Sequence, residues 1–367
     1  MASSPAAGPV RLPDVEAVVL VGGLGTRMRP LTLSVPKPML PLAGVPVLAH
    51  LLGRIRAAGV HHVVLSTSYH AEVFERSFGD GSALGLELDY LVEEEPLGTG
   101  GGIRNVAPKL SAPDVLVFNG DVLCGLDPAD VVRTHRSVEA DVTLHLVRVA
   151  DPRAFGCVPI TPDGRVVAFL EKTGDPPTDL INAGCYVFRR EVIDSIPAGR
   201  AVSVEHETFP QLLAAGAHLH AHVDASYWLD LGTPAAFVQG SADVVRGVLP
   251  SLVLPGPVGE ALLLPGATVH PNARVDGGSV VGAGATVQSG AVVSGSVLMD
   301  RVRVGPGAQV QRSALGPGAQ VGAEAVLDGA VLGEGAVVGA RCELRHGIRV
   351  WPRVVLPDGG VRFSPDA

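Results

Sequence analysis

A glycine-rich loop followed by two cationic side chains carries the strongest chemical signal in the sequence. The loop follows the apolar, strand-like run Val15–Val21 and contains three glycines, Gly22, Gly23 and Gly25. Glycine lets backbone N–H groups approach a ligand closely and adopts positive φ at little cost. Arg27 and Lys37 come next, and cations beside exposed backbone amides suit a polyanion of the phosphate type. The segment therefore predicts nucleotide phosphate chemistry.

Two common glycine motifs do not fit this loop. The P-loop, Gly-x-x-x-x-Gly-Lys-Ser/Thr, requires a lysine that does not stand in that place. The dinucleotide fingerprint Gly-x-Gly-x-x-Gly, counted from Gly23, meets Met28 where its third glycine belongs. A tight turn after a buried strand, with Arg27 merely solvated, is the alternative explanation for the glycines taken alone.

Lysine is rare in this chain, so its few positions are informative. Of 28 basic residues, only Lys37, Lys109 and Lys172 are lysines. A compact ammonium on a flexible stem is not equivalent to a planar guanidinium, so a lysine kept in an arginine-rich chain indicates a chemical requirement. Lys37 lies between two prolines that restrict the backbone, and Lys172 follows an apolar run. Lys109 has no such setting, and we expect it at the surface.

Two aspartates are candidates for holding a metal ion. Asp121 follows the buried run 115–119 at an expected strand end, and Asp230 lies in the sequence Tyr-Trp-Leu-Asp-Leu-Gly-Thr-Pro. Mg²⁺ is usually held by one or two carboxylates together with substrate phosphate oxygens. Ordinary turn chemistry at Asp121 and a helix N-terminal loop at Asp230 are the alternatives.

Three other segments carry polar groups next to expected strands. Glu171 and Lys172 follow a buried strand, which places the lysine to reach a second phosphate. Asn182 precedes another strand and can present an amide to sugar hydroxyls. Gly98 and Thr99 belong to a second glycine loop that would let a flat base approach the backbone. Taken singly, each segment fits a turn or surface role equally well.

Bulk properties narrow the class of protein. A chain of 367 residues is long enough for two domains and a large core. Its net charge of −9 argues against a nucleic-acid or anionic-membrane surface, although not against nucleotide binding. We see no apolar run of the roughly 18–20 residues that span a membrane, no signal-peptide pattern, and no zinc or disulfide spacing among the cysteines. We expect a cytoplasmic protein.

The first two thirds of the chain alternate between strand-like and helix-like segments. Buried strands are expected at Val18–Val21, Val63–Thr67, Leu86–Val92, Val115–Asn119 and Val142–Val147. Helical periodicity covers Pro46–Ala58 and Asp127–Val138. The alternation predicts a mostly parallel sheet covered by helices, with ligands at the carboxyl ends of its strands. An inserted mixed subregion facing the same cleft is expected from further short runs at 158–160, 166–170 and 183–188.

From about residue 256 the spacing of aliphatic residues changes to a six-residue repeat. Sixteen aliphatic residues recur at Val269, Val275, Val281, Val287, Val293, Leu298, Val304, Val310, Leu315, Val321, Leu327, Leu332, Val338, Leu344, Val350 and Leu356. Three steps are five residues long, and these short steps are themselves 17 residues apart, as in a three-sided coil with one shortened face. Such coils bury their aliphatic faces by stacking, so the pattern predicts a solenoid rather than a disordered tail.

Together the motifs resemble those of one enzyme family. They are Gly-Gly-x-Gly-Thr-Arg-Met-Arg-Pro-Leu-Thr, Pro-Lys-Pro, Glu-Pro-Leu-Gly-Thr, Asn-Gly-Asp, Phe-Gly, Glu-Lys, Ile-Asn-Ala-Gly and Trp-x-Asp-x-Gly-Thr-Pro. The chain resembles the sugar-1-phosphate nucleotidyltransferases, and within them the mannose-1-phosphate guanylyltransferases (GDP-mannose pyrophosphorylases) of the actinobacterial type. The resemblance covers nearly the whole chain after residue 14.

The resemblance implies a fold and a division of the chain. The fold is an α/β, Rossmann-like nucleotidyltransferase domain with a mixed, mostly parallel sheet, followed by a left-handed parallel β-helix of hexapeptide repeats. We expect a flexible tail at 1–13, a catalytic domain at 14–248, a linker at 249–255, the β-helix at 256–361 and a final tail at 362–367.

The resemblance also implies residue roles. The catalytic set is Arg27, Lys37, Asp121, Lys172 and Asp230. Asp121 and Asp230 are the implied ligands of Mg²⁺. The nucleotide side comprises Gly22, Gly23, Gly25, Thr26, Gly98 and Thr99. The sugar-phosphate side comprises Gly156, Glu171, Lys172 and Asn182. Two departures from the family pattern affect base and sugar preference: Thr173 replaces a proline, and Gly100-Gly-Gly replaces Ala-Gly-Pro.

The implied reaction joins two anions. A mannose-1-phosphate oxygen would attack the α-phosphorus of GTP in line and expel pyrophosphate, with cations and Mg²⁺ offsetting the repulsion. We find no convincing covalent nucleophile or acid–base dyad in the sequence.

Three alternatives remain at this stage. One is the same reaction with glucose-1-phosphate and UTP, dTTP or ATP, and another is a non-catalytic regulatory subunit. The third is an acyltransferase, since solenoids of this type often have that activity. Such an enzyme requires a histidine base, and the only histidines in the repeats are His270 and His346. We expect a structural or assembly role for the solenoid, with its flat sides pairing subunits of a homo-oligomer.

Overall fold

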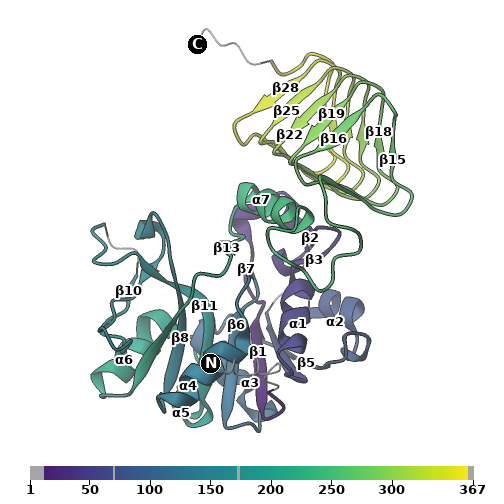
Figure 1. Ribbon diagram of the computed structural model, residues 1–367. Coiled ribbons are helices and arrows are strands. Elements are labelled where there is room, and N and C mark those ends of the chain that lie inside the picture. Colours follow the sequence, from purple (N-terminus) through teal and green to yellow (C-terminus); the bar gives the residue numbers. More distant parts are fainter. Residues whose placement is uncertain (1–11, 69–70, 172–173, 363–367) are drawn as a thin grey trace, which may run out of the picture. The chain divides into compact units, whose positions relative to one another are not determined.

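The computed structural model describes residues 12–68, 71–171 and 174–362, and Figure 1 shows its helices and strands. The chain divides into two compact units. The sheet unit comprises Met1–Gly23 and Leu51–Trp228, and the coil unit comprises Leu24–His50 and Leu229–Ala367. The segment that carries Arg27 and Lys37 therefore belongs to the same compact unit as the C-terminal coils.

The sheet unit contains a nine-stranded mixed sheet in the order β10-β9-β11-β6-β1-β4-β5, with β8 paired to β11 and β12 paired to β8. The strands are β1 (Val15–Leu20), β4 (His62–Thr67), β5 (Glu87–Val92), β6 (Asp114–Asn119), β8 (Val142–Arg148), β9 (Gly156–Cys157), β10 (Leu170–Glu171), β11 (Leu180–Arg189) and β12 (Leu219–Val223). Strands β6, β1, β4 and β5 pair in parallel, whereas β11 is antiparallel to β6 and β8. Parallel strands covered on both faces are almost continuously apolar, which explains why these runs were recognisable in the sequence.

Seven α-helices alternate with the strands along the described part of the chain, and the sequence predicts two of them. They are α1 (Val47–Ala57), α2 (Ala71–Phe78), α3 (Gly98–Val106), α4 (Pro128–Ser137), α5 (Arg190–Ser195), α6 (Phe209–Ala214) and α7 (Pro234–Val245). Helix α3 packs against β1 and β4, and α4 packs against β8. The Asp127 carboxylate caps α4 by accepting the Ala129 N–H, and Pro128 takes the first helical position. The periodicities at 46–58 and 127–138 are thus confirmed as helices α1 and α4.

Two sequence expectations differ from the structure. The glycine stretch that begins at Gly98 forms the first turns of α3, not an open loop. A methyl group on Gly101 would come within 2.7 Å of the Arg200 carbonyl oxygen, so glycine permits close packing there. The runs at 158–160 and 166–170 give only the isolated bridge Ile160↔Val166 and the two-residue strand β10.

The six-residue repeat forms a three-sided coil, as predicted (Figure 1, green to yellow). Coil sheet A consists of β14 (Ala261–Leu263), β17 (Ser279–Val281), β20 (Val297–Leu298), β23 (Ala314–Leu315), β26 (Val331–Leu332) and β29 (Arg349–Val350). Coil sheet B consists of β15 (Thr268–Val269), β18 (Thr286–Val287), β21 (Arg303–Val304), β24 (Gln320–Val321), β27 (Val337–Val338) and β30 (Val355–Leu356). Coil sheet C consists of β16 (Arg274–Asp276), β19 (Val292–Ser294), β22 (Gln309–Gln311), β25 (Val326–Asp328) and β28 (Glu343–Arg345).

All sixteen periodic aliphatic residues lie in these strands and fall on the three sheets in rotation. Pairing within each sheet is parallel, which is consistent with the left-handed β-helix that the family resemblance implies. The five-residue steps lead from coil sheet C to coil sheet A, where buried serines stack 17 residues apart. The hydroxyl of Ser279 accepts the Ser296 N–H at 3.1 Å, and the hydroxyl of Ser296 accepts the Ser313 N–H at 3.1 Å. These bonds satisfy backbone donors at the tight corner.

In the part of the chain that the structure describes, no helix has the length and apolar character needed to cross a membrane.

Replacement of Leu327 by alanine tests the contribution of the coil interior to stability. Leu327 is fully buried in coil sheet C, so the substitution leaves a cavity and is expected to cost about 2–5 kcal/mol of unfolding free energy. Leu263→Ala, at a side chain 52% exposed in coil sheet A, is the control and is expected to cost under about 1 kcal/mol. Urea unfolding of the full chain measures both. Equal costs would contradict the assignment of Leu327 to the interior.

Candidate active site

The coil unit places two predicted cations, Arg27 and Lys37, beside the carboxylate of a third predicted residue, Asp230. Arg27 lies in the short helix η1 (Thr26–Met28), Lys37 opens η3 (Lys37–Met39), and Asp230 ends β13 (Trp228–Asp230). The Asp230 carboxylate lies 3.9 Å from a guanidinium nitrogen of Arg27 and 3.8 Å from the Lys37 ammonium. Side chains separated by about 200 residues in sequence therefore lie close together.

Local backbone structure explains how the two cations are placed. Gly25 has φ 57°, a left-handed conformation that favours glycine, and it precedes the first turn of η1. The Gly25 carbonyl accepts the Thr32 hydroxyl at 2.8 Å and the Met28 N–H at 2.9 Å. Met28 is buried beneath the loop, so its neighbour Arg27 is directed outward. Pro36 and Pro38 flank Lys37 and fix the backbone of η3.

The two cations differ in environment. The Lys37 side chain is 8% exposed, whereas that of Arg27 is 69% exposed. A buried ammonium beside Asp230 is a fixed point charge, and an exposed guanidinium can reorient towards an incoming ligand. Asp230 is an ionic partner of both cations, and two cations placed this close together suit a polyanionic ligand.

The sheet unit carries further candidates, two of which come just after its central strands. Gly22 follows β1, and its carbonyl accepts the Ser68 hydroxyl at 2.6 Å. Asp121 is half-buried in the turn between β6 and β7 (Val122–Cys124). The carboxyl ends of parallel β1 and β6 lie side by side, because Leu20 pairs with Asn119. Ligands of open α/β sheets bind at this edge.

The sugar-side candidates lie on adjacent strands of the same sheet. Glu171 in β10 pairs with Gly156 in β9, and β9 in turn pairs with β11, which carries Asn182. The Asn182 amide donates to the Tyr186 hydroxyl at 2.6 Å and its oxygen accepts the Gly184 N–H at 3.1 Å. These bonds fix the orientation of the Asn182 side chain. Lys172 and Thr173 lie outside the described residues.

Sequence reasoning missed the partner of Thr99. The Thr99 hydroxyl donates to the Glu205 carboxylate at 2.9 Å and accepts the Val204 N–H at 2.9 Å. Glu205 also accepts the Ser203 hydroxyl at 2.9 Å, and it lies in a π-helical turn, Val204–Thr208. π-Helical turns are frequent at functional sites, but they have no signature in a single sequence.

Two cysteines of the sheet unit are candidate nucleophiles, because cysteine thiolates are strong nucleophiles. Burial raises the pKa of the Cys185 thiol well above its usual range, and burial also raises the pKa of the Cys124 thiol. Neither cysteine is therefore poised as a thiolate nucleophile. No group of three or more histidine, cysteine or acidic side chains is placed to hold a metal ion within the described ranges.

Two family models together match most of the chain. The family described as "Nucleotidyl transferase" matches residues 16–247, and the family described as "GMPPB C-terminal domain" matches residues 257–364.

Curated relatives match along most of the chain as well. A protein of Mycobacterium tuberculosis named mannose-1-phosphate guanylyltransferase is 64% identical, over 96% of this chain and 99% of the relative. A protein of Drosophila pseudoobscura named mannose-1-phosphate guanylyltransferase catalytic subunit beta is 36% identical, over 71% of this chain and 72% of the relative.

Solved structures share the fold. The crystal structure of HddC from Yersinia pseudotuberculosis complexed with GMP-PN has 31% sequence identity and a TM-score of 0.55, covering 62% of this chain and 97% of that chain. A putative glucose-1-phosphate thymidylyltransferase from Bacillus anthracis, at 20% identity and a TM-score of 0.58, shows a likeness of fold alone.

Replacement of Gly232 by alanine tests whether the position of Arg27 matters. The added methyl would lie 2.6 Å from the Arg27 guanidinium and 2.8 Å from the Asp230 carboxylate. The flexible arginine can move aside, so we expect unchanged stability but a loss of about 10- to 100-fold in pyrophosphate-releasing turnover. Gly259→Ala, where no atom lies within 4 Å of the added methyl, is the matched control. Wild-type turnover of Gly232→Ala would contradict the assignment.

Proposed function

The chain belongs to the nucleotidyl transferase family, and we propose that it is a mannose-1-phosphate guanylyltransferase. It transfers the guanylyl group of GTP to mannose-1-phosphate, giving GDP-mannose and pyrophosphate. The relative from Mycobacterium tuberculosis bears the name of this activity and aligns with nearly the whole chain. The β-helix also matches a family model of its own, so the support is not limited to the sheet.

The pairing of Arg27 and Lys37 around Asp230 is the observation that carries this proposal. A nucleotidyl transfer needs no covalent nucleophile, but it must bring two phosphate-bearing anions together. A fixed ammonium and a mobile guanidinium in one cluster offset that repulsion. They also stabilise the negative charge that spreads over the α-phosphate in the transition state.

Nucleotidyltransferases of this family generally use a divalent metal ion. We propose that this ion is Mg²⁺ and that Asp121 and Asp230 hold it. Their carboxylate oxygens are the hard donors that Mg²⁺ prefers, and the Asp230 side chain is 29% exposed and thus accessible. When bound, the ion supplies charge neutralisation and orients phosphate oxygens.

The other predicted residues divide between the two substrates. We assign the backbone of Gly22, Gly23 and Gly25, together with Thr26, to the nucleotide. Gly98 and Thr99 are assigned to the base, where the bond of Thr99 to Glu205 stabilises the start of α3. We assign Gly156, Glu171, Lys172 and Asn182 to the sugar phosphate. The adjacent strands β9, β10 and β11 bring the backbones of three of these residues together.

We also propose a cytoplasmic homo-oligomer. All four cysteines are free thiols, which suits a reducing compartment. Coil sheet B has polar outward positions along β15, β18, β21 and β24, and such a flat face is compatible with a polar subunit contact.

A grid assay tests the substrate pair. Pyrophosphate release is measured for GTP, UTP, dTTP and ATP, each with mannose-1-phosphate and glucose-1-phosphate in the presence of Mg²⁺. We expect GTP with mannose-1-phosphate to give the highest kcat/KM. A higher kcat/KM with glucose-1-phosphate would leave the proposed type of reaction in place but refute mannose-1-phosphate as the preferred sugar substrate. No release with any pair would favour the non-catalytic regulatory subunit.

Substitution of the two cations tests their proposed role. Arg27→Ala and Lys37→Ala each remove a strong electrostatic donor and are expected to lower turnover about 10²- to 10³-fold. Lys109→Ala is the matched control, because Lys109 is a half-exposed surface lysine paired with Asp89. Steady-state kinetics with saturating substrates measure the effect. Turnover within a few-fold of wild type for either cation variant would refute its role.

A further inference from the structure

Coil sheet A differs from the other coil sheets in having an apolar outer face. The register aligns one column of outward positions, Leu262, Val280, Val297, Ala314, Val331 and Arg349. Side chains alternate between faces along a strand, and the neighbouring aliphatic residues, such as Leu298 and Leu332, fill the coil interior. The first five members of the column are nevertheless almost fully buried. The outer face of coil sheet A is therefore covered by other parts of the coil unit.

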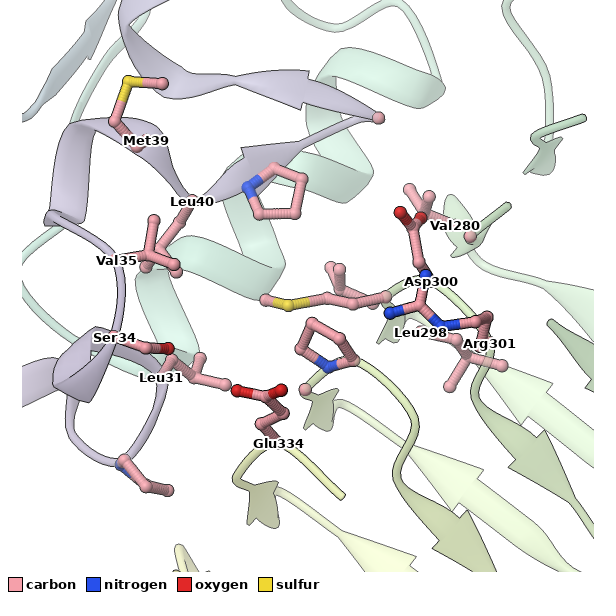
Figure 2. A pocket seen from close by; sticks show the side chains of 18 of the residues that line it. Leu31, Ser34, Val35, Met39, Leu40, Val280, Leu298, Asp300, Arg301 and Glu334 are labelled. Carbon is pink, nitrogen blue, oxygen red and sulfur yellow. The ribbon is translucent and has the colours of Figure 1, made fainter. Parts of the chain in front are cut away.

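Two segments of the same unit cover this face. Helix α7 packs against β17, and residues 30–44, which follow the Arg27 loop, face the strands across a cavity of about 320 Å³. Figure 2 shows Leu31, Val35 and Leu40 of this segment on one side of the cavity, with Val280 and Asp300 of the coils on the other. A cavity of this size means that direct packing between the segment and the coils is incomplete.

The sixth member of the column makes a polar contact instead. The Arg349 guanidinium donates a hydrogen bond of 2.7 Å to the Arg29 carbonyl, across 320 positions of sequence. Arg29 closes η1, since its N–H bonds to the Thr26 carbonyl at 3.2 Å. Arg349 therefore holds the end of the turn that carries Arg27, while the Thr32 hydroxyl holds its beginning at Gly25.

We propose that the β-helix is a positioning platform for the phosphate-binding loop and that Arg349 is its positioning residue. The Arg27 side chain is 69% exposed and lies 3.9 Å from Asp230, so its direction depends on the backbone of η1 more than on side-chain contacts. Arg349 fixes that backbone where packing is incomplete. The inference rests on the proposed function for the role of Arg27, but the hydrogen bond and the apolar face do not depend on it.

A double-mutant cycle tests the proposal in the full chain. Arg349→Ala is expected to lower kcat/KM for GTP about 10-fold, because a shifted loop moves Arg27 out of its productive position. In the Arg27→Ala background the same change is expected to cost less than about 2-fold, since Arg349 acts through Arg27. Arg349→Lys, which keeps a donor, is expected to recover most of the loss. Arg345→Ala, in coil sheet C, is the matched control and is expected to keep wild-type kinetics.

A second measurement is independent of activity. Hydrogen exchange of the peptide spanning residues 24–34 is expected to be faster in Arg349→Ala than in the wild type, with an unchanged melting temperature. The positioning role would be overturned if Arg349→Ala lowered kcat/KM equally in the wild-type and Arg27→Ala backgrounds. A lowered melting temperature, or unchanged hydrogen exchange of residues 24–34, would also overturn it. If the wild type releases no pyrophosphate, the proposed function fails, and the exchange experiment still decides whether Arg349 tethers the loop.

Discussion

Electrostatic repulsion between two phosphate-bearing substrates is the constraint on which this molecule depends. At separations of a few ångströms, unit charges interact by several kcal/mol outside bulk water, about 4 kcal/mol at 4 Å for an effective dielectric of 20. A chain with a net charge of −9 must therefore concentrate positive charge locally. It does so with Arg27 and Lys37 around Asp230, one cation exposed and the other nearly buried. The shared carboxylate keeps the two cations close together before a ligand arrives.

The fold supplies positions for these charges from distant parts of the sequence. Parallel β1 and β6 end side by side, which brings the glycine loop and the turn of Asp121 to one sheet edge. Strands β9, β10 and β11 bring the backbones of Gly156, Glu171 and Asn182 together. The Arg27 loop and the β-helix belong to one compact unit, although more than 200 residues separate them in sequence. The coils therefore contribute to the surroundings of the loop as well as to the stability of the chain.

Much of this could be predicted from the sequence, for identifiable reasons. Buried parallel strands and stacked six-residue coils both need regular apolar residues, so β1, β6 and all sixteen coil positions were recognisable. The packing of helix α3 against residues 200–208 could not be predicted. Glycines that permit close packing cannot be distinguished in a sequence from glycines that form a loop. The bond of Thr99 to Glu205 and that of Arg349 to Arg29 join residues more than 100 positions apart. No local pattern encodes such pairs. The apolar outer column of coil sheet A did leave a signal, the Val-Val, Val-Leu and Ala-Leu pairs at 280–281, 297–298, 314–315 and 331–332.

The central claim is that Arg27 and Lys37 bind the phosphates of the substrates, so that Lys37 contributes to phosphate binding and not to binding of the rest of the nucleotide. The most direct measurement is the ratio of the dissociation constants of guanosine and GTP, determined by calorimetry for the wild type and for Lys37→Ala. We expect the wild type to bind GTP far more tightly than guanosine, and the substitution to weaken GTP binding while leaving guanosine binding unchanged. An equal loss of affinity for both ligands, or no loss for either, would contradict the central claim.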